Sequence, residues 1–393
     1  MKRYIILMFC LLQASSLVKG QNSVNDYLNF LNNKQLSPKE YVFKQFETSD
    51  IVILGERDHR DTTQYDLILD ILSDERFTNN IGYVYTEVGV INRTEWANTI
   101  LKNQYVSDSE FEKELIKLYR QLDFNPLWDK YNMFKYLKGI YNINKILPIE
   151  KKISIGLTDC EFDWDGMTFQ KYNAFEKKIY KEPFARDSIM ASNFLTLYEK
   201  QKSKNGKKKA LLIQNQPHAV NINIDYKNKK IKSTGSYIKE RYGSNVKIIL
   251  LNWFNYQEGL LTDDGKWDAA YELSNHKSVG FDLSGTPFGR TSYHLNYEQN
   301  ITYENIADGF LFYKPFYHFI AAIGIPNLVD DHFATELLNR SIIVSGEGSK
   351  RANDYIKSPM NAKERLKKYY TNIRTFDCAD NNRLKRQMKK WIK

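Results

Sequence analysis

Residues 51–59 read IVILGERDH, and this stretch indicates the fold of the chain. Four consecutive apolar residues, most of them β-branched, predict a strand buried on both faces, as in parallel sheets that are covered by helices. Glu56 and His59 follow where that strand ends, and residues 63–72 then carry apolar side chains at helical spacing. A strand, a polar turn and a helix therefore follow one another, which is the repeating unit of α/β proteins.

The same order recurs along the chain. Short apolar segments predict further strands, listed here by residue number: 82–86, 153–157, 210–213, 246–251, 278–283 and 309–313. Helical patterns lie between them, over 183–198 and 236–241, and a longer helical region over 94–144 breaks at Asn125-Pro126. We therefore predict an α/β fold with a mostly parallel central sheet flanked by helices and with a helical insertion at 93–145.

Composition is that of a globular protein. Of the 393 residues, 42% are hydrophobic and 26% are charged, which excludes disordered and collagen-like classes. No internal repeat or low-complexity linker is visible, so we expect a single domain over 21–393 with a basic C-terminal tail at 358–393. Three cysteines are too few for a disulfide scaffold or a four-thiolate zinc site.

The first twenty residues resemble an export signal. Lys2 and Arg3 precede an apolar run over 4–12, and a weaker stretch ends at Gly20. This pattern predicts a signal peptide over 1–20, cleaved before Gln21. The run is shorter than the roughly 20 residues that a membrane-spanning helix needs. We therefore expect an exported protein, periplasmic or secreted, with no stable membrane span after cleavage.

The formal net charge of +10 is concentrated in two places, the loop KSKNGKKK at 202–209 and the C-terminal tail. Basic runs bind nucleic acid in some proteins. No zinc-finger spacing and no RNA-binding aromatic motif accompanies these runs, so we interpret them as a solvated loop and a solvated helix face. No nucleic-acid partner is expected.

Polar residues gather where the predicted strands end. In an open parallel sheet, ligands bind beyond the carboxyl ends of the strands, because the connecting loops converge there. Any one such residue is commonly a helix cap or a turn residue, but six from four separate segments together predict a site. These six are Glu56, His59, Glu87, Asp159, Asn215 and His218.

Several chemistries are excluded by their missing motifs. The sequence contains no G-x-S-x-G, G-x-G-x-x-G, Walker loop, H-E-x-x-H or C-x-x-C motif. No serine or cysteine therefore lies in a recognisable nucleophile motif, and attack by activated water is expected in place of a covalent intermediate.

The motifs, taken in order, resemble the erythromycin esterase family. GERDH at 55–59 is similar to the G-E-x-x-H-G motif of that family, and Glu87 matches its second glutamate. GLTD at 156–159, RDSIMASN at 186–193 and NQPH at 215–218 resemble its later segments, and the likeness extends from about residue 50 to 313. Two departures are Arg60, which replaces a glycine, and one extra residue before His218.

The resemblance implies hydrolysis of an ester or related acyl bond in a small molecule, with no cofactor. His59 would be the general base, oriented by Glu56 or Glu87, and His218 would donate a proton to the oxyanion or leaving group. Arg186, Asp159 and Asn215 would bind substrate or orient these groups. Arg60 would narrow the mouth of the pocket, which argues against a macrolide substrate.

Two other functions use the same residues. His59, His218, Glu56 and Glu87 are suitable ligands for a divalent metal such as zinc or manganese, as in the related Tiki-type metalloproteases. A non-catalytic, haem-binding protein of the envelope, as in ChaN-like relatives, is the third interpretation.

Overall fold

The computed structural model describes residues 22–182, 185–205, 207–226, 229–254, 259–293 and 301–392. The predicted signal peptide at 1–20 and Pro183, the first residue of the helical pattern predicted over 183–198, lie outside these ranges. Within the described residues, no helix is both long and apolar enough to cross a membrane.

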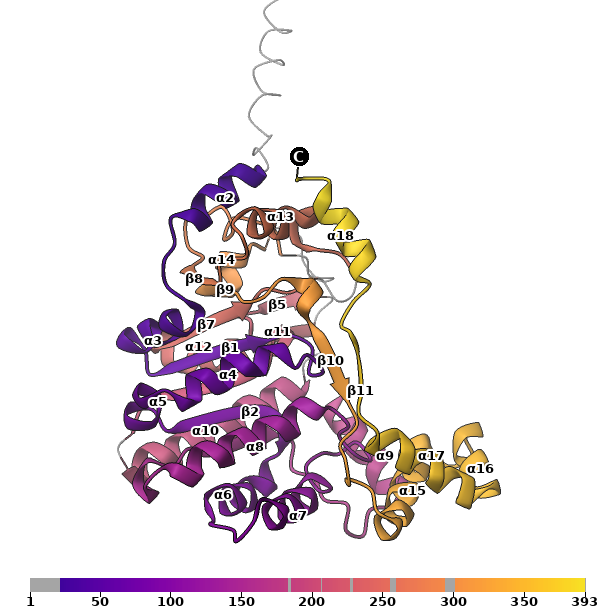
Figure 1. Ribbon diagram of the computed structural model, residues 1–393. Coiled ribbons are helices and arrows are strands. Elements are labelled where there is room, and N and C mark those ends of the chain that lie inside the picture. Colours follow the sequence, from indigo (N-terminus) through magenta and orange to yellow (C-terminus); the bar gives the residue numbers. More distant parts are fainter. Residues whose placement is uncertain are drawn as a thin grey trace, which may run out of the picture.

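A seven-stranded sheet forms the centre of the molecule (Figure 1), with strand order β3-β2-β4-β1-β7-β9-β8. Neighbouring strands are parallel except β8, which is antiparallel to β9. This confirms the predicted α/β class with a mostly parallel sheet. The strands are β1 (Ile51–Glu56), β2 (Tyr83–Val90), β3 (Ser154–Asp159), β4 (Ala210–Asn215), β7 (Val246–Leu251), β8 (Val279–Asp282) and β9 (Gly309–Phe312).

Helices cover both faces of the sheet. Alternate residues of β1 point to opposite sides: Val52 and Leu54 join one buried cluster, and Ile51 and Ile53 join the other. The first face carries α3 (Pro38–Thr48), α4 (Thr63–Ser73), α5 (Glu75–Asn80), α6 (Thr94–Lys102), α7 (Asp108–Tyr119) and α8 (Tyr131–Ile146). The second carries α2 (Val24–Asn32), α10 (Ala185–Asn205), α11 (Gln216–Ala219), α12 (Thr234–Tyr242) and α13 (Lys266–Leu273). Burial on both sides explains the nearly continuous apolar strands.

A glycine fixes how closely two of these helices approach. Gly235 lies in the first turn of α12, and a Cβ atom at this position would come within 1.8 Å of the backbone oxygen of Ala219 in α11. Only glycine has no Cβ, so α11 can pack against the start of α12. This packing places His218, the residue before Ala219, at the edge of the sheet.

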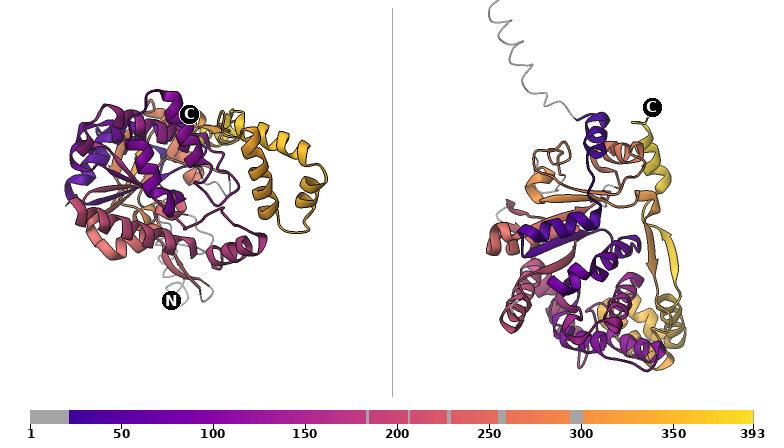
Figure 2. Two further views of the ribbon diagram at one scale, coloured as in Figure 1. Left: turned by 90° about the horizontal axis from the view of Figure 1, so that it is seen from below. Right: turned by 60° about the vertical axis from the view of Figure 1, so that its left-hand side comes forward.

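The C-terminal part adds a lobe and a two-stranded ribbon. Strands β10 (Ile320–Ile323) and β11 (Arg374–Asp377) pair antiparallel, and the helices α15 (Asp331–Ser345), α16 (Lys350–Lys357) and α17 (Pro359–Thr371) project away from the sheet (Figure 2). The remaining elements are α9 (Phe169–Ile179), α14 (Tyr303–Ile306), α18 (Asn381–Lys389) and the hairpin of β5 (Asn223–Tyr226) and β6 (Lys229–Lys232).

The segment predicted as a basic tail, 358–393, is folded over its described part. It forms α17, β11 and α18, and it buries Ala362, Leu366, Leu384 and Met388. The basic residues of its described part are exposed or half-exposed, whereas the four apolar residues named here face inward. A solvated helix face therefore describes its basic residues, but the segment as a whole is part of the fold.

Candidate active site

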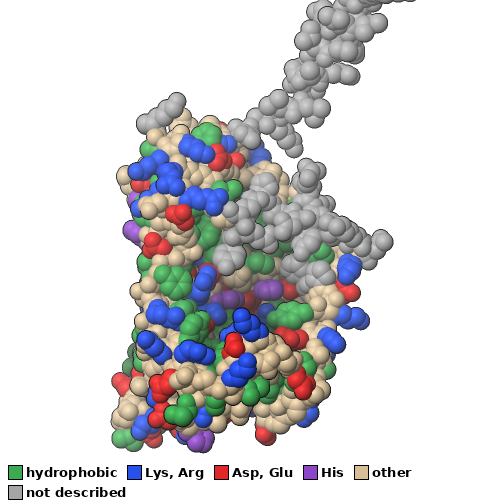
Figure 3. All heavy atoms as spheres, turned by 90° about the vertical axis from the view of Figure 1, so that its right-hand side faces the viewer, with side chains coloured by type: hydrophobic (Ala, Val, Ile, Leu, Met, Phe, Trp, Pro, Cys, Tyr) green, Lys and Arg blue, Asp and Glu red, His purple; other side chains and the backbone are tan. Residues whose placement is uncertain are grey.

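The predicted residues meet at the carboxyl edge of the sheet. Glu56, Asp159 and Asn215 are the last residues of β1, β3 and β4, and the parallel register pairs Glu56 with Asn215. Thr86 is the last residue of β2 that pairs in regular register with both β3 and β4, and Glu87 comes directly after it. Figure 3, which shows the right-hand side of Figure 1, has histidine side chains within a recess on this face.

The first centre is a histidine held between two glutamates. Nδ1 of His59 lies 2.5 Å from Oε1 of Glu56, and Nε2 lies 2.9 Å from Oε1 of Glu87. The second oxygen of Glu56 accepts a hydrogen bond of 2.9 Å from the Tyr65 hydroxyl, and the second oxygen of Glu87 accepts one of 3.0 Å from the Asn215 backbone N–H. Both carboxylates are 1% exposed, whereas the ring of His59 is 23% exposed. Only the ring reaches the recess.

This arrangement fixes the charge of His59. Burial alone lowers the pKa of an imidazole, but Glu56 and Glu87 outweigh it and raise the pKa of His59 to about 10. Burial alone raises the pKa of a carboxyl group, yet the nearby His218 and His59 bring the pKa of Glu87 down to about 2. At neutral pH these two shifts favour an imidazolium at His59 beside the carboxylate of Glu87.

The second centre is a histidine held by one carboxylate. Nδ1 of His218 lies 2.9 Å from each oxygen of Asp187. Asp187 is 1% exposed and also accepts hydrogen bonds of 2.9 and 3.0 Å from the backbone N–H and hydroxyl of Thr234. Burial lowers the pKa of His218, but Glu87 and Asp187 reverse that effect and raise it. A carboxylate at Nδ1 keeps a proton there, so the neutral ring carries its lone pair on Nε2.

Arg186 pairs with Asp159 and with neither glutamate. Nε and Nη2 of Arg186 donate hydrogen bonds of 2.8 and 2.6 Å to the two oxygens of Asp159, in the two-pronged geometry of arginine with a carboxylate. The guanidinium also lies over the ring of Phe124, 5.5 Å from its centroid. Arg186 and Asp159 thus form one ion pair beside Glu87, in which Asp159 is buried and the Arg186 side chain is 22% exposed. Burial lowers the pKa of Arg186, but the charge of Asp159 and then that of Glu87 outweigh it and raise this pKa.

Asn215 positions Glu87 through its backbone. Its side-chain Nδ2 donates to the backbone oxygen of Arg57. The role of orienting His218, which the sequence suggested for Asn215, belongs to Asp187 in the structure.

A buried network holds the loop that carries His59. The Arg57 side chain is 1% exposed and donates to Asp61 Oδ2, to Asn252 and to the backbone oxygen of Tyr313. Its guanidinium lies 3.7 Å from the ring centroid of Phe319. From α8, Asn132 donates hydrogen bonds of 2.7 Å to the backbone oxygens of His59 and Asp61. Hydrogen bonds to α8 and to the residues that follow β7 and β9 therefore hold this loop in place.

Arg60 turns back onto its own loop. Its guanidinium donates to both oxygens of Asp58 and lies 5.7 Å from the ring of Phe376 in β11. Closer to the centre, the ring of Trp128 meets the ring of His59 edge-on, with 5.4 Å between the centroids. Nζ of Lys130 lies 4.5 Å from the Trp128 ring centroid. The recess therefore has an aromatic wall beside the first histidine.

The first centre also has the composition of a metal site. One ligand atom each from Glu56, His59 and Glu87 lies within 4.8 Å of the others. Two carboxylates and an imidazole suit zinc, manganese or iron. The same atoms hold the proton of His59, so a metal ion would have to compete with that proton.

Sequence reasoning missed three residues of the site. Asp187 lay within the RDSIMASN segment, where an acidic residue next to Arg186 on a helix was a usable signal. Tyr65 was read only as part of the apolar stripe of α4, although its hydroxyl bonds to Glu56. Trp128 lies in the connection between α7 and α8, and nothing in its local sequence connects it with His59.

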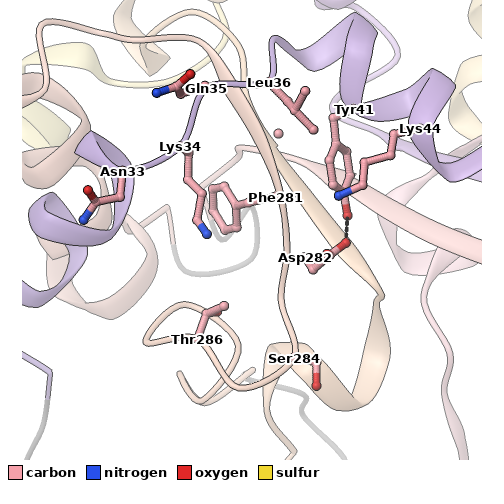
Figure 4. Close-up of a pocket in the computed structure, with 11 residues that line it drawn as sticks. Asn33, Lys34, Gln35, Leu36, Tyr41, Lys44, Phe281, Asp282, Ser284 and Thr286 are labelled. Carbon is pink, nitrogen blue, oxygen red and sulfur yellow. Dashed lines mark hydrogen bonds between the residues drawn. The ribbon is translucent and has the colours of Figure 1, made fainter.

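A surface pocket of about 330 Å³ lies elsewhere (Figure 4). It is lined by residues 33–36, by Tyr41 and Lys44 of α3 and by the end of β8, where Asp282 accepts a hydrogen bond of 2.7 Å from Tyr41. Asp282 pairs with Gly309, the first residue of β9. The pocket is therefore at the amino edge of the sheet, opposite to the histidines, and none of the candidate site residues lines it.

Comparison with known proteins adds a likeness in fold. No protein-family model and no curated protein matches the sequence. Among solved structures, a succinoglycan biosynthesis protein has a TM-score of 0.51 at 10% identity, over 75% of this chain and 97% of its own. A Bacillus cereus protein has a TM-score of 0.49 at 11% identity, over 74% of this chain and 97% of its own.

A mutant erythromycin esterase, EreC, in its open conformation has a TM-score of 0.37 at 11% identity, over 72% of this chain and 95% of its own. The likeness to the succinoglycan biosynthesis protein, whose TM-score is above 0.5, is a likeness of fold at low sequence identity.

Proposed function

We propose that the protein is a hydrolase that cleaves an ester or related acyl bond of a small molecule by attack of water. The observation that supports this proposal best is the pair of histidines at one sheet edge, each held by buried carboxylates. Hydrolysis needs one group that takes a proton from water and one that returns a proton to the leaving group. Two histidines in different electrostatic surroundings provide both.

The surroundings assign the roles. A base must be neutral before reaction and an acid must be protonated, so a site needs two groups in opposite protonation states. Glu56 and Glu87 keep a proton on His59, which makes it the acid. Asp187 at Nδ1 leaves Nε2 as the nitrogen of His218 that accepts a proton, so His218 is the base once it is deprotonated, above its raised pKa. This is the reverse of the assignment that the family resemblance implies.

Water is the expected nucleophile. Cys160, next to Asp159, is 3% exposed, and burial together with the Asp159 charge raises the pKa of its thiol to about 12. A thiol with such a pKa carries almost no thiolate at neutral pH. A single hydrolytic step without an acyl-enzyme therefore fits the site.

The test is a panel of small-molecule esters and acyl compounds, assayed with the wild type and with His59→Gln and His218→Gln. We expect turnover in the wild type and little in either variant. The pH profile of the wild type should fall at low pH as His218 gains a proton, and at high pH as His59 loses its proton near pH 10. A panel without turnover, or equal turnover in the variants, contradicts the proposal.

A metal-dependent hydrolase is the second candidate, supported by the closeness of the ligand atoms of Glu56, His59 and Glu87. A divalent ion held there would lower the pKa of a bound water. The two candidates differ in a binding experiment: calorimetric titration with zinc or manganese releases protons if the ion displaces the proton of His59. No heat of binding, together with turnover in EDTA, favours the metal-free candidate.

Export is part of the proposal. The N-terminal pattern supports cleavage before Gln21, and mass spectrometry of secreted or periplasmic material would measure it directly. A mature mass that includes Met1 contradicts cleavage.

A further inference from the structure

Lysines gather at the amino edge of the sheet, where the strands begin. Nζ of Lys207, in the connection between α10 and β4, lies 2.9 Å from where a Cβ of Gly82 would be. The backbone oxygen of Gly82 accepts a hydrogen bond of 2.9 Å from the N–H of Ser154, and the Ser154 hydroxyl accepts one of 2.5 Å from Nζ of Lys102. The ammonium groups of Lys102 and Lys207 therefore lie on either side of the Gly82–Ser154 contact.

Two more lysines complete this cluster. Nζ of Lys152, a residue that is 8% exposed, donates a hydrogen bond of 2.7 Å to the backbone oxygen of Lys102. Burial lowers the pKa of Lys102, and the charges of Lys204, Lys152 and Lys207 lower it further, while Glu95 raises it. None of the four lysines forms an ion pair with a residue that the structure describes. The nearby Glu95 is paired with Lys200. The charge of Glu95 also acts on Lys102 and Lys204, so the cluster of Lys102, Lys152, Lys204 and Lys207 has more positive charge than this one neighbouring carboxylate offsets.

Exposed aliphatic side chains lie beside this cluster. Val106, Ile146 and Ile149 are 98%, 84% and 72% exposed. Lys145 at the end of α8 forms an ion pair of 3.0 Å with Asp108 at the start of α7, which brings Ile146 near Val106.

Hydrogen bonds connect these aliphatic side chains to the lysines. Asn144 of α8 donates 3.1 and 3.0 Å hydrogen bonds to the backbone oxygens of Leu101 and Ile153, the neighbours of Lys102 and Lys152. The exposed aliphatic residues and the lysines thus lie near one another at the ends of α6, α8 and α10. These helix ends are on the left-hand side of Figure 1.

We propose that this surface docks on a bilayer that contains anionic lipids. Isolated exposed aliphatic residues are ordinary, but three beside an excess of lysines over carboxylates match the two layers of a membrane interface: acyl chains for the aliphatic side chains and acidic headgroups for the exposed ammonium groups. A free anion would satisfy the lysines and leave the aliphatic side chains in water. The bilayer is the occupant that matches both.

Docking in this way orients the protein. The surface is at the amino ends of β2, β3 and β4, and the histidines are at the carboxyl edge. A protein bound to a bilayer through its amino edge therefore turns the candidate active site toward the aqueous phase, where a water-soluble substrate would enter.

Flotation with phospholipid vesicles tests the proposal. The wild type should float with vesicles of phosphatidylcholine mixed with phosphatidylglycerol and not with phosphatidylcholine alone. Lys204→Glu with Lys207→Glu should weaken the partition by roughly fivefold or more for each lysine, since a lysine near an anionic surface contributes about 1 kcal/mol. The matched control is Lys363→Glu with Lys368→Glu on α17, which changes the net charge equally and should keep most of the binding.

A second pair separates a bilayer from a soluble polyanion. Val106→Ser with Ile146→Ser should weaken flotation and leave binding to polyphosphate unchanged. The proposal is overturned if the wild type does not float with the anionic vesicles, if both charge-reversal pairs lose binding equally, or if the serine pair floats as the wild type does. All these side chains are on the surface, and thermal unfolding verifies that each variant is folded.

Discussion

The two histidine centres are built from the same kinds of side chain, but they differ in how many carboxylates hold the ring. His59 has a glutamate at each nitrogen, and His218 has one aspartate that spans Nδ1. Two carboxylates stabilise the proton of His59 up to about pH 10, whereas one carboxylate also fixes which nitrogen of His218 is basic. A histidine at a sheet edge is therefore not sufficient evidence for a base, because its buried neighbours decide its charge.

The largest effects are expected when the histidine of either centre is removed. His59→Ala and His218→Ala should each lower turnover by about 10² to 10⁴, the usual contribution of an acid or base. They should differ in stability: His59→Ala leaves Glu56 and Glu87 buried without their cation, which costs about 3–5 kcal/mol of unfolding free energy. Asp187 keeps its hydrogen bonds to Thr234 after His218→Ala, so that loss should be smaller.

Urea denaturation of both variants measures this difference. If His59 lay in an open, solvent-lined cleft, its removal would leave folding nearly intact. Equal stability of the two variants would support that view and contradict the one developed from the structure.

The pH dependence of stability should also separate the centres. The pKa of His59 rises from 6.5 to about 10 on folding, so its contribution is complete below pH 6.5 and is lost as the pH rises toward 10. The pKa of Glu87 falls from 4.5 to about 2, so that contribution is complete above pH 4.5 and is lost as the pH falls toward 2. The difference in unfolding free energy between wild type and His59→Gln should therefore shrink between pH 6.5 and 10. A difference that stays constant over this range would show that His59 has no raised pKa.

A smaller effect is expected when the single carboxylate of the second centre is neutralised. Asp187→Asn keeps the shape of the side chain but lets an amide face Nδ1, which no longer fixes the tautomer of His218, so turnover should fall by about 10². Thr234→Val is the matched control, because it removes one hydrogen bond to Asp187 and keeps the charge. Kinetics of both variants at several pH values provide the measurement, and equal losses would assign Asp187 a merely structural role.

The smallest effect is expected for Cys160, which follows Asp159 at the end of β3 and belongs to neither histidine centre. Cys160→Ala should leave turnover within about twofold of the wild type, because the raised pKa of the buried thiol keeps it protonated. Intact mass spectrometry during turnover should find no covalent adduct. An adduct on Cys160, or loss of activity in the variant, would replace water by the thiol as nucleophile.

Much of this arrangement was predictable from the sequence, for a physical reason. Strands buried on both faces are nearly continuous apolar runs, so all seven strands of the central sheet were found, and their carboxyl ends located Glu56, Glu87, Asp159 and Asn215. The ribbon of β10 and β11 was missed. Its strands are short, and the four residues of β11 are all exposed, so no apolar run marks them.

The electrostatics were not predictable in the same way. The spacing of Glu56 and His59 suggests their contact, but the second contact of His59, to Glu87, depends on how two strands separated by β4 end at the same height. Asp187 meets His218 only because α10 and α11 approach each other in space. Long-range placement of this kind leaves no periodic pattern in the residues themselves.

The buried guanidinium of Arg57 has a consequence for the order in which the protein is made. The ribosome completes the loop of Glu56 and His59 early, but Asn252, Tyr313 and Phe319, which surround the Arg57 guanidinium, are added some two hundred residues later. Until then the charge has only Asp61 and Thr63 beside it and is best left in water. The loop that is translated among the first should therefore be among the last to become rigid. Prematurely terminated chains would leave this charge without its surroundings, and such products would be open to proteolysis at this loop.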